Sequence, residues 1–233
     1  MQKLGIAVAL PQELKPLTRE SVKPGTCFWI NDHMVVSLNG IGAKRADAGG
    51  QMLIAEGIDI LVSWGSAGAL HANIPLGALL LPGKVIDAFQ NTFVAEENIY
   101  NKIKENIPAH IQVVHDPLAE TSIALTDTLQ KKAFREASGA VAVDMESGTL
   151  ARLAHQHHIP FVVIRSVADT STMQIPKSIF KSMSMEGKIN FALLCQQLLL
   201  HPADCLALLR LSLGFGKAKN TLTQVAQILK NWH

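Results

Sequence analysis

Charged residues and cysteines are both scarce in this sequence. Only 17% of the 233 residues are charged, and the formal net charge of +2 lacks the concentrated excess of Lys and Arg that a nucleic-acid-binding protein carries. The three cysteines, Cys27, Cys195 and Cys205, are odd in number, far apart and without a C-x-x-C pair. The sequence therefore predicts no nucleic-acid partner, no disulfide framework and no zinc site.

A long apolar run is also missing, although the mean hydropathy is +0.21 and 48% of the residues are hydrophobic. No segment reaches the ~18 to 20 uninterrupted apolar residues that a membrane-spanning helix needs. The stretch Met1-Gln2-Lys3 leads straight into an apolar strand pattern, with no small-residue cleavage site after it. We therefore expect a cytoplasmic protein with a large hydrophobic core.

Charge is unevenly distributed along the chain. Residues 1–176 contain 14 Lys and Arg against 17 Asp and Glu, whereas residues 177–233 contain 7 against 2. A basic, leucine-rich segment of this kind can lie on an anionic membrane surface, which would make the protein peripheral to the membrane. However, the leucines at 206, 208, 209, 211 and 213 spread too far round a helix for a clean interfacial face. Burial in the core or in an oligomer contact is therefore favoured, and weak membrane contact is the alternative.

Short apolar runs alternate with helix-length segments as far as residue 170, which is typical of a largely parallel β-sheet covered by helices. Strands are predicted at 4–10, 34–38, 60–63, 78–86, 112–114, 122–125, 141–145 and 161–166, and helices at 11–20, 43–56, 96–105, 126–136 and 146–157. Later residues predict helices alone, at 186–200, 203–213 and 217–230. We expect one α/β domain over residues 1–233, with a helical C-terminal part at 177–233.

Several nucleotide-binding and catalytic motifs are incomplete. The glycines at 40 and 42 begin a G-x-G-x-x-G pattern, but Arg45 takes the place of its third glycine. The segment Gly65-Ser66-Ala67-Gly68 is one residue short of a G-x-S-x-G elbow, and no Walker motif occurs. The histidines at 155, 157 and 158 have no carboxylate at ligand spacing, so they predict an exposed helix end and no metal site.

Carboxylates follow three of the predicted strands. Glu13 comes after the first strand, Asp144 and Glu146 end the strand at 141–145, and Asp169 follows the strand at 161–166. The carboxyl ends of parallel strands form the ligand-binding edge of an α/β sheet, where burial and mutual repulsion raise carboxyl pKa values. Each acid alone is better explained as a helix cap or first-turn residue. All of them together, with the glycine-containing segment 65–68, favour a single pocket.

Three stretches of the chain resemble a known family. I-L-V-S-W-G-S-A-G at 60–68, A-V-D-M-E-S at 142–147 and F-V-V-I-R-S-V-A-D at 161–169 have an order and spacing similar to the nucleoside phosphorylase and nucleosidase superfamily. The resemblance extends from Leu4 to Asp169. It implies a three-layer α/β/α sandwich with a mixed central sheet, no cofactor, and a homo-oligomer, with a dimer favoured. A narrower similarity to hopanoid-associated phosphorylases, through residues 139–147 and the tail at 201–211, implies adenosylhopane as a substrate.

The same resemblance implies a reaction and a set of site residues. The closest chemistry is that of 5′-methylthioadenosine/S-adenosylhomocysteine nucleosidases, which cleave the bond between adenine and C1′ of ribose. Asp169 matches the acid that protonates purine N7, Glu13 the carboxylate that orients the attacking water, and Glu146 the acceptor for the ribose hydroxyls. Further substrate contacts implied by the match are Met145 against the sugar, and Ser66, Ala67, Gly68, Ile123 and Ala124 around the base and C1′.

Two positions depart from the family's pattern. Ala168 stands where a serine often precedes the catalytic aspartate, and Ser63 stands where hexameric phosphorylases carry a phosphate-binding arginine. The second departure favours water as the nucleophile. If phosphate is instead a co-substrate, Ser66, Arg45 or Arg165 would bind it. The alternatives are thus a phosphate-dependent purine nucleoside phosphorylase and, from a different class, a non-catalytic protein that binds a nucleoside or a lipid.

Overall fold

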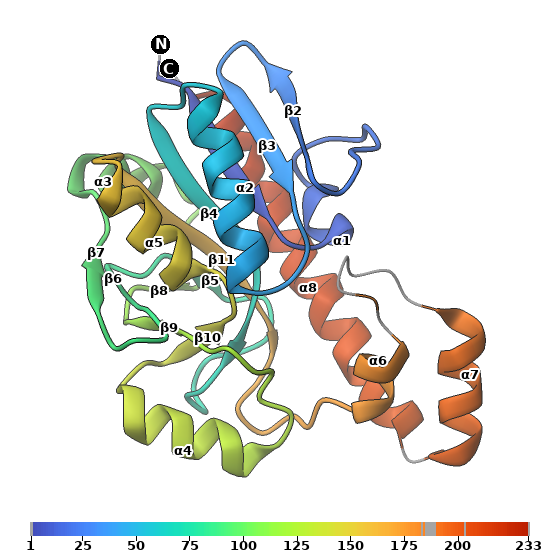
Figure 1. Ribbon diagram of the computed structural model, residues 1–233. Coiled ribbons are helices and arrows are strands. Elements are labelled where there is room, and N and C mark those ends of the chain that lie inside the picture. The colour runs from blue at the N-terminus through green and yellow to red at the C-terminus, as the bar shows by residue number, and fades with distance from the viewer. Residues whose placement is uncertain (1, 183, 185–189, 203, 233) are drawn as a thin grey trace.

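The computed structural model describes residues 2–182, 184, 190–202 and 204–232 (Figure 1). Within these residues, eleven strands form one mixed sheet with helices on both faces, which confirms the three-layer α/β/α prediction. The strands are β1 Leu4–Val8, β2 Thr26–Asn31, β3 Met34–Leu38, β4 Ile60–Ala69, β5 Leu79–Leu80, β6 Lys84–Ile86, β7 Thr92–Val94, β8 Val113–Val114, β9 Leu118–Glu120, β10 Ala142–Asp144 and β11 Phe161–Asp169. The helices are α1 Pro11–Leu14, α2 Ala43–Ala55, α3 Glu97–Asn106, α4 Thr128–Ser138, α5 Ser147–Gln156, α6 Lys177–Ser182, α7 Phe191–Leu200 and α8 Asp204–Lys230.

The sheet has a parallel centre with antiparallel additions. Its main path runs β2-β3-β1-β4-β10-β9-β6-β7, while β11 pairs with β4 and β5, and β8 pairs with β5. Strands β3, β1, β4 and β11 are parallel neighbours in that order, whereas β2 is antiparallel to β3 and β10 is antiparallel to β4. The carboxyl ends of β1, β4 and β11 therefore meet at one edge of the sheet.

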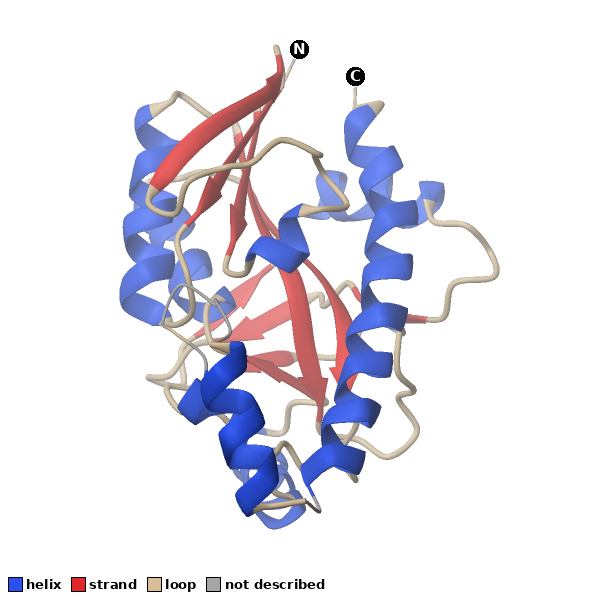
Figure 2. Ribbon diagram, turned by 90° about the vertical axis from the view of Figure 1, so that its right-hand side faces the viewer, coloured by secondary structure: helices blue, strands red, loops and turns tan. Residues whose placement is uncertain are grey.

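Helices α2 and α5 cover one face of the sheet, and α8 runs along the other (Figures 1 and 2). Side chains of β1 alternate between the faces because successive residues of a strand point in opposite directions. Leu4, Ile6 and Val8 join the core that contains Leu222 of α8, while Ala7 joins the core of α2 and α5. The C-terminal half of α8 therefore belongs to the main core of the domain.

Two of the predicted elements near the site are wrong in extent or position. The predicted helix 11–20 ends at Leu14, because Pro16 has no N–H to donate to a helical hydrogen bond. The predicted strand 122–125 is irregular, and the strand β9 precedes it at Leu118–Glu120. The hydroxyl of Thr121 exchanges hydrogen bonds with the backbone of Ile123, which replaces strand pairing there.

In two further places the structure differs from the predicted elements: one strand was missed, and two predicted helices are one. Strand β2 was not predicted, although it forms a hairpin with β3 around Asp32 and His33. The predicted helices 203–213 and 217–230 are one continuous helix, α8, in which Gly214 lies against the backbone of β11. Part of the predicted helix 186–200 lies outside the described residues, and α7 occupies Phe191–Leu200.

Candidate active site

The predicted strand 60–63 extends further than expected, because the segment 65–68 forms the second half of β4. Gly65 pairs with Arg165 of β11, and a β-bulge between Val167 and Asp169 places Asp169 opposite Gly68. A Cβ on Gly68 would lie 3.1 Å from Asp169 Oδ2 and 3.2 Å from Oδ1. A larger residue than glycine at position 68 would therefore crowd the Asp169 carboxyl group.

Glu13 is fixed by the backbone on both sides of it. Its Oε1 accepts hydrogen bonds from Ser66 N at 2.8 Å and Ser66 Oγ at 2.6 Å, and its Oε2 accepts one from Leu10 N at 3.0 Å. Gly65, with φ of +150°, passes directly beneath the carboxylate, and a Cβ there would lie 2.8 Å from Glu13 Oε2 and from Arg165 Nη1. Glycine at 65 thus permits the close approach of these two charged groups.

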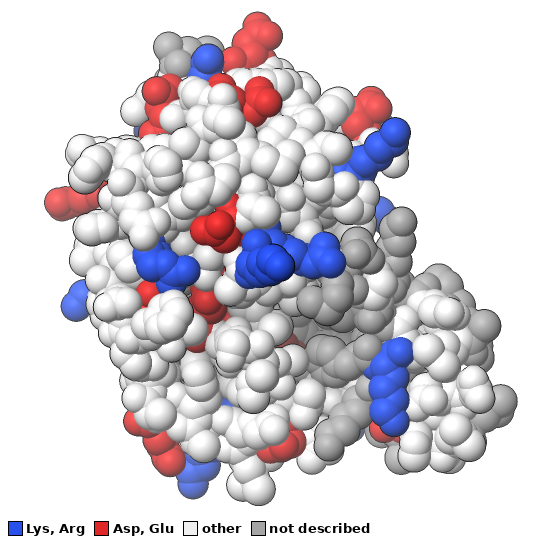
Figure 3. Space-filling model, viewed as in Figure 1, with Lys and Arg blue, Asp and Glu red and all other residues white. Residues whose placement is uncertain are grey.

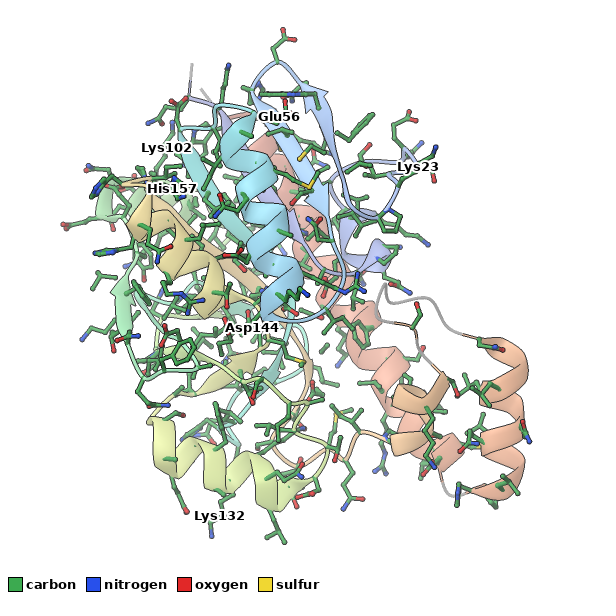
Figure 4. All side chains as sticks on the ribbon, viewed as in Figure 1. Lys23, Glu56, Lys102, Lys132, Asp144 and His157 are labelled. Atoms are coloured by element: carbon green, nitrogen blue, oxygen red, sulfur yellow. The ribbon has the colours of Figure 1, made fainter. Side chains whose placement is uncertain are left out.

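Arg165 connects the acids of the site. Its Nε lies 3.0 Å from Asp144 Oδ2, and its Nη2 lies 3.2 Å from Glu146 Oε2. The same guanidinium donates to Ser63 Oγ at 2.9 Å and to the carbonyl of Ser66 at 3.1 Å. We call Glu13, Asp144, Glu146 and Arg165 the carboxylate cluster; Asp144 is labelled near the centre of the molecule in Figure 4.

Burial and charge shift the pKa values of this cluster. Burial raises the pKa of Glu146 to about 7, with repulsion from Asp144 adding to the effect and attraction to Arg165 opposing it. Burial alone would lower the pKa of Arg165, but Asp144 and Glu146 raise it above its ordinary value. Glu146 also accepts a hydrogen bond from Gly42 N at 2.9 Å, at the N-terminus of α2. Arg165 therefore stays charged, and Glu146 changes its charge near neutral pH.

Asp169 has a separate partner. Lys131 of α4 places Nζ 2.5 Å from Asp169 Oδ2, and the lysine side chain is 1% exposed. Burial raises the pKa of Asp169, and the charge of Lys131 opposes that effect. Lys131 was not among the predicted site residues. A usable signal was its position three residues before Phe134, which places both side chains on one face of the helix.

A cavity of about 840 Å³ joins these groups to the C-terminal helices. This volume is within the range of about 300–1,000 Å³ that is usual for small-molecule sites. One end contains the carboxylate cluster and the Asp169–Lys131 pair. The other end is lined mainly by apolar side chains from α6, α7 and α8 and the segment before them, among them Ile175, Ile179, Leu194, Leu198, Leu208, Leu211, Phe215 and Leu222.

The structure brings most of the predicted substrate residues to this cavity. Its lining includes Glu13, Ser66, Ala67, Gly68, Ala124, Met145, Glu146 and Asp169. Ile123 is the predicted substrate residue that does not line the cavity, and it is 62% exposed. The Thr121 hydroxyl holds the backbone of Ile123 in a local turn.

The three predicted phosphate ligands are already engaged with the protein. Ser66 donates both its N–H and its hydroxyl to Glu13, and Arg165 is buried against Asp144 and Glu146. Arg45 does not line the cavity, and its Nη1 lies 3.3 Å from the carbonyl of Asn39. These contacts occupy donor groups that a phosphate would need, so the three phosphate ligands stay a prediction.

The surface near the cavity is weakly charged. Figure 3 shows Lys and Arg on both sides of a small acidic area, with most of the rest of that face uncharged. On α8 the leucines 206, 209 and 213 are 56%, 59% and 59% exposed, and Leu211 is buried, so the expected burial of the leucines applies to part of the set. Within the described residues, no helix is long and apolar enough to cross a membrane, and no three His, Cys, Asp or Glu side chains are grouped as a metal site requires.

Comparison with known proteins gives a family and several relatives. Residues 3–198 match the phosphorylase superfamily. A 5′-methylthioadenosine/S-adenosylhomocysteine nucleosidase from Buchnera aphidicola subsp. Schizaphis graminum is 25% identical over an alignment of 203 positions that covers 72% of this chain and 84% of that protein.

Solved structures share the whole fold. The corresponding nucleosidase from Neisseria meningitidis, in complex with methylthio-immucillin-A, superposes with a TM-score of 0.73 and 19% identity over 100% of both chains. Futalosine hydrolase from Helicobacter pylori gives a TM-score of 0.69 and 18% identity over 98% of this chain and 96% of that one. The match over residues 3–198 confirms the resemblance found in the sequence and, with it, the prediction of an enzyme that cleaves a glycosidic bond. The chain belongs to the phosphorylase superfamily.

Proposed function

We propose that the protein hydrolyses the N-glycosidic bond of a 5′-substituted adenine nucleoside and releases adenine. The observation that carries this proposal is the position of Asp169, Glu146 and Glu13 at one end of a cavity whose other end is apolar. The first end offers an acid and two acceptors for a nucleoside. The second end offers apolar surface to whatever is attached at its 5′ carbon.

The arrangement suits the chemistry of C1′–N cleavage. In the transition state, positive charge develops on the ribose and negative charge on the purine. Asp169 has a raised pKa because it is buried, which helps it to hold a proton for purine N7. Ionised Glu146 can accept hydrogen bonds from the ribose hydroxyls and stabilise the positive charge of the sugar, against which Met145 would pack.

Glu13 supports water as the nucleophile. A carboxylate has about four acceptor positions, and Ser66 and Leu10 use three of those of Glu13. The remaining position can orient one water molecule towards C1′. A phosphate anion at the same place would meet the negative charges of Glu13, Asp144 and Glu146, of which Arg165 compensates only part.

The decisive experiment measures adenine release with and without phosphate. Adenosine, 5′-methylthioadenosine and an adenosine with a long 5′-alkyl group are incubated with the purified chain. We expect adenine and a free 5′-substituted ribose in both conditions. A ribose 1-phosphate formed only with phosphate would support the phosphorylase alternative. Binding of nucleosides without any adenine release would support the non-catalytic alternative.

The apolar end of the cavity favours a large hydrocarbon at the 5′ position, as in adenosylhopane, over the small methylthio group. Each buried CH₂ contributes about 0.8 kcal/mol, or roughly fourfold in affinity. We therefore expect kcat/KM to rise along a series of 5′-alkylthioadenosines of increasing length. Leu194→Gln, inside the cavity, should flatten this rise, and the matched variant Leu200→Gln, on the exposed side of α7, should keep it. Equal kcat/KM for all chain lengths would contradict the assignment of a long hydrocarbon.

Exposed leucines beside the cavity favour weak contact with a membrane surface. Leu209 is exposed and also lines the cavity, and the C-terminal part carries the net positive charge of the chain. We expect more binding to vesicles that contain phosphatidylglycerol than to phosphatidylcholine vesicles. The double variant Leu206→Asp and Leu213→Asp should lose the difference, whereas Leu129→Asp on α4 should retain it. Equal binding by the wild type to both lipids would contradict the contact.

The cytoplasmic location and the homo-oligomer stay predictions at this point. The dimer predicted from the family resemblance can be tested by sedimentation equilibrium of the full chain. A dimer is expected, and a mass near 25.2 kDa at micromolar concentration would contradict it.

A further inference from the structure

The lysine beside Asp169 uses all of its hydrogen-bond donors. Lys131 Nζ lies 2.5 Å from Asp169 Oδ2, 2.8 Å from the carbonyl of Thr170 and 2.9 Å from the carbonyl of Met173. An ammonium has three donors and no acceptor, whereas a neutral amine has only two donors. Three oxygen acceptors around Nζ therefore fit the charged form of Lys131.

Lys131 also gives the Asp169 carboxyl a side-chain hydrogen-bond donor, which the neighbouring residue Ala168 lacks. Ala168, without a hydroxyl, stands where a serine often supports the aspartate in the family, and its methyl group cannot hold the Asp169 carboxyl. Lys131 reaches the carboxyl from α4 and also binds two carbonyls in the segment that follows β11. It fixes both the carboxyl and the chain immediately after it.

This pairing has a chemical consequence for the reaction. Asp169 must hold a proton when the purine leaves, yet an ammonium at 2.5 Å favours the ionised carboxylate. Burial acts in the opposite direction and raises the pKa of Asp169. An N–H of the ammonium therefore points directly at the carboxyl group that needs a proton, and the ion pair is neutral as a whole.

We propose, on the basis of the function proposed above, that Lys131 stores the proton that Asp169 delivers to the purine. An N–H bond of the ammonium breaks as an O–H bond forms on the carboxyl group, and the carboxyl group passes a proton to N7. The electron pair of the C1′–N bond goes into the purine ring. A water molecule adds to C1′ as the bond to the purine breaks, and the proton that this water loses returns to Lys131 and restores its ammonium before the next turnover. Since Lys131 acts through Asp169, it is a positioning residue.

The surrounding charges leave Lys131 as the main charged influence on Asp169. On α4 itself, Asp127 caps the helix through Gln130 N, and Lys132 and Glu136 face solvent. The other charged side chains that line the cavity are Glu13, Lys15, Asp144, Glu146, Arg165 and Lys219. Asp144, Glu146 and Glu13 shift the pKa of Arg165, whereas Lys131 is the charge that acts on the pKa of Asp169.

The first test compares Lys131→Met with the control Lys132→Met, whose lysine lies on the same helix with a side chain 74% exposed. For each protein, kcat/KM for adenine release is measured from about pH 5.5 to about pH 9. In Lys131→Met, Asp169 loses its proton at its own pKa, so the ratio of wild-type to variant kcat/KM should grow about tenfold for each pH unit above that value. Glu146 is present in both proteins, and its titration cancels in the ratio. The control should follow the wild type, and a ratio for Lys131→Met that is constant with pH would overturn the proposal.

The second test is a double-mutant cycle, which gives a result even if Lys131→Met alone destabilises the fold. Asp169→Asn is compared with Asp169→Asn plus Lys131→Met, which buries no unpaired charge. If Lys131 acts through Asp169, adding Lys131→Met should change the residual kcat less than about twofold, whereas in the wild-type background at alkaline pH the loss should approach about 10²-fold. An equal loss in both backgrounds would overturn the proposal. Absence of adenine release by the wild type would instead refute the proposed function.

Discussion

The close contact between α8 and β11 leads to a prediction with opposite signs at two neighbouring glycines. A Cβ on Gly214 would lie 1.9 Å from the carbonyl oxygen of Ala168 and 3.1 Å from Leu76 Cδ2. An ordinary carbon–oxygen contact is about 3.3 Å, so α8 would have to move away by roughly 1.4 Å. At Gly216, two residues further along the same helix, a Cβ would meet no atom within 4 Å.

The expected magnitudes follow from these distances. Overpacking destabilises a protein by about 1–3 kcal/mol, and a clash with backbone belongs at the upper end of that range. Replacing glycine by alanine inside a helix stabilises it by about 1 kcal/mol. We expect Gly214→Ala to lower the free energy of unfolding by about 2 kcal/mol and Tm by about 4–8 °C. Gly216→Ala should raise the free energy of unfolding by about 0.5–1 kcal/mol and Tm by about 1–4 °C.

Differential scanning calorimetry of the two variants and the wild type measures both shifts. Gly214→Ala should also reduce adenine release, because Ala168 directly precedes Asp169 and displacement of the acid by about 1 Å can cost 10²-fold in rate. An unchanged or raised Tm for Gly214→Ala would refute the conclusion that glycine is required there by close packing. Equal decreases in the Tm of both variants would contradict the expected gain in helix stability at position 216.

Three further predictions concern the charged groups. Asp169→Asn should lower kcat for adenine release by about 10²–10⁴-fold with an unchanged circular dichroism spectrum, and activity near the wild-type value would contradict its role as the acid. Burial raises the pKa of Glu146 to about 7, and its proposed role requires the ionised form to accept the ribose hydroxyls, so kcat/KM should rise as pH increases through about 7. Glu146→Gln should be slower and lack this rise, and an unchanged pH profile in that variant would contradict the proposed role. Arg165→Met leaves Asp144 and Glu146 buried without their cation, so urea unfolding should show a loss of about 3–5 kcal/mol, and a loss below 1 kcal/mol would disprove that the cluster depends on Arg165.

The acids of the site could be predicted from the sequence because their positions depend on strand ends. Glu13 follows β1 and Asp169 is the last residue of β11, and these two strands flank β4 as parallel neighbours. Apolar runs identify such strands, and the parallel arrangement then brings the acids together. The three family stretches add the same information independently.

Other features depend on contacts that no local pattern records. Position 214 of α8 requires glycine because the backbone of β11, which is distant in sequence, packs directly against it. The sequence offered Arg165 as a possible phosphate ligand. Only the structure shows that its guanidinium group already forms ion pairs with Asp144 and Glu146. Lys131 lies 38 residues from Asp169, and its pairing depends on how α4 packs against the end of β11.

The hairpin β2-β3 and the turn after β9 were missed for local reasons. Strand β2 has no buried residue, since it lies at the end of the sheet, and its polar turn at Asp32 and His33 was the signal that could have identified it. Thr121 was assigned no local role, although threonine hydroxyls often bind nearby backbone groups and interrupt regular structure.

Helix α8 gives the protein a thermodynamic link between its cavity and its core. The helix is 27 residues long, and Leu208, Leu211 and Phe215 in its first half line the apolar end of the cavity. In its second half, Val225 and Leu229 are packed into the main core, and Leu222 belongs to both the core and the cavity lining. A ligand that holds the first half in place therefore restrains an element on which the whole domain depends. Occupancy of the cavity is coupled to global unfolding, so that a ligand at 100 times its Kd adds about 2.7 kcal/mol to the stability of the folded chain. The enzyme would be most stable when a ligand fills the cavity and most susceptible to unfolding and degradation when the cavity is empty.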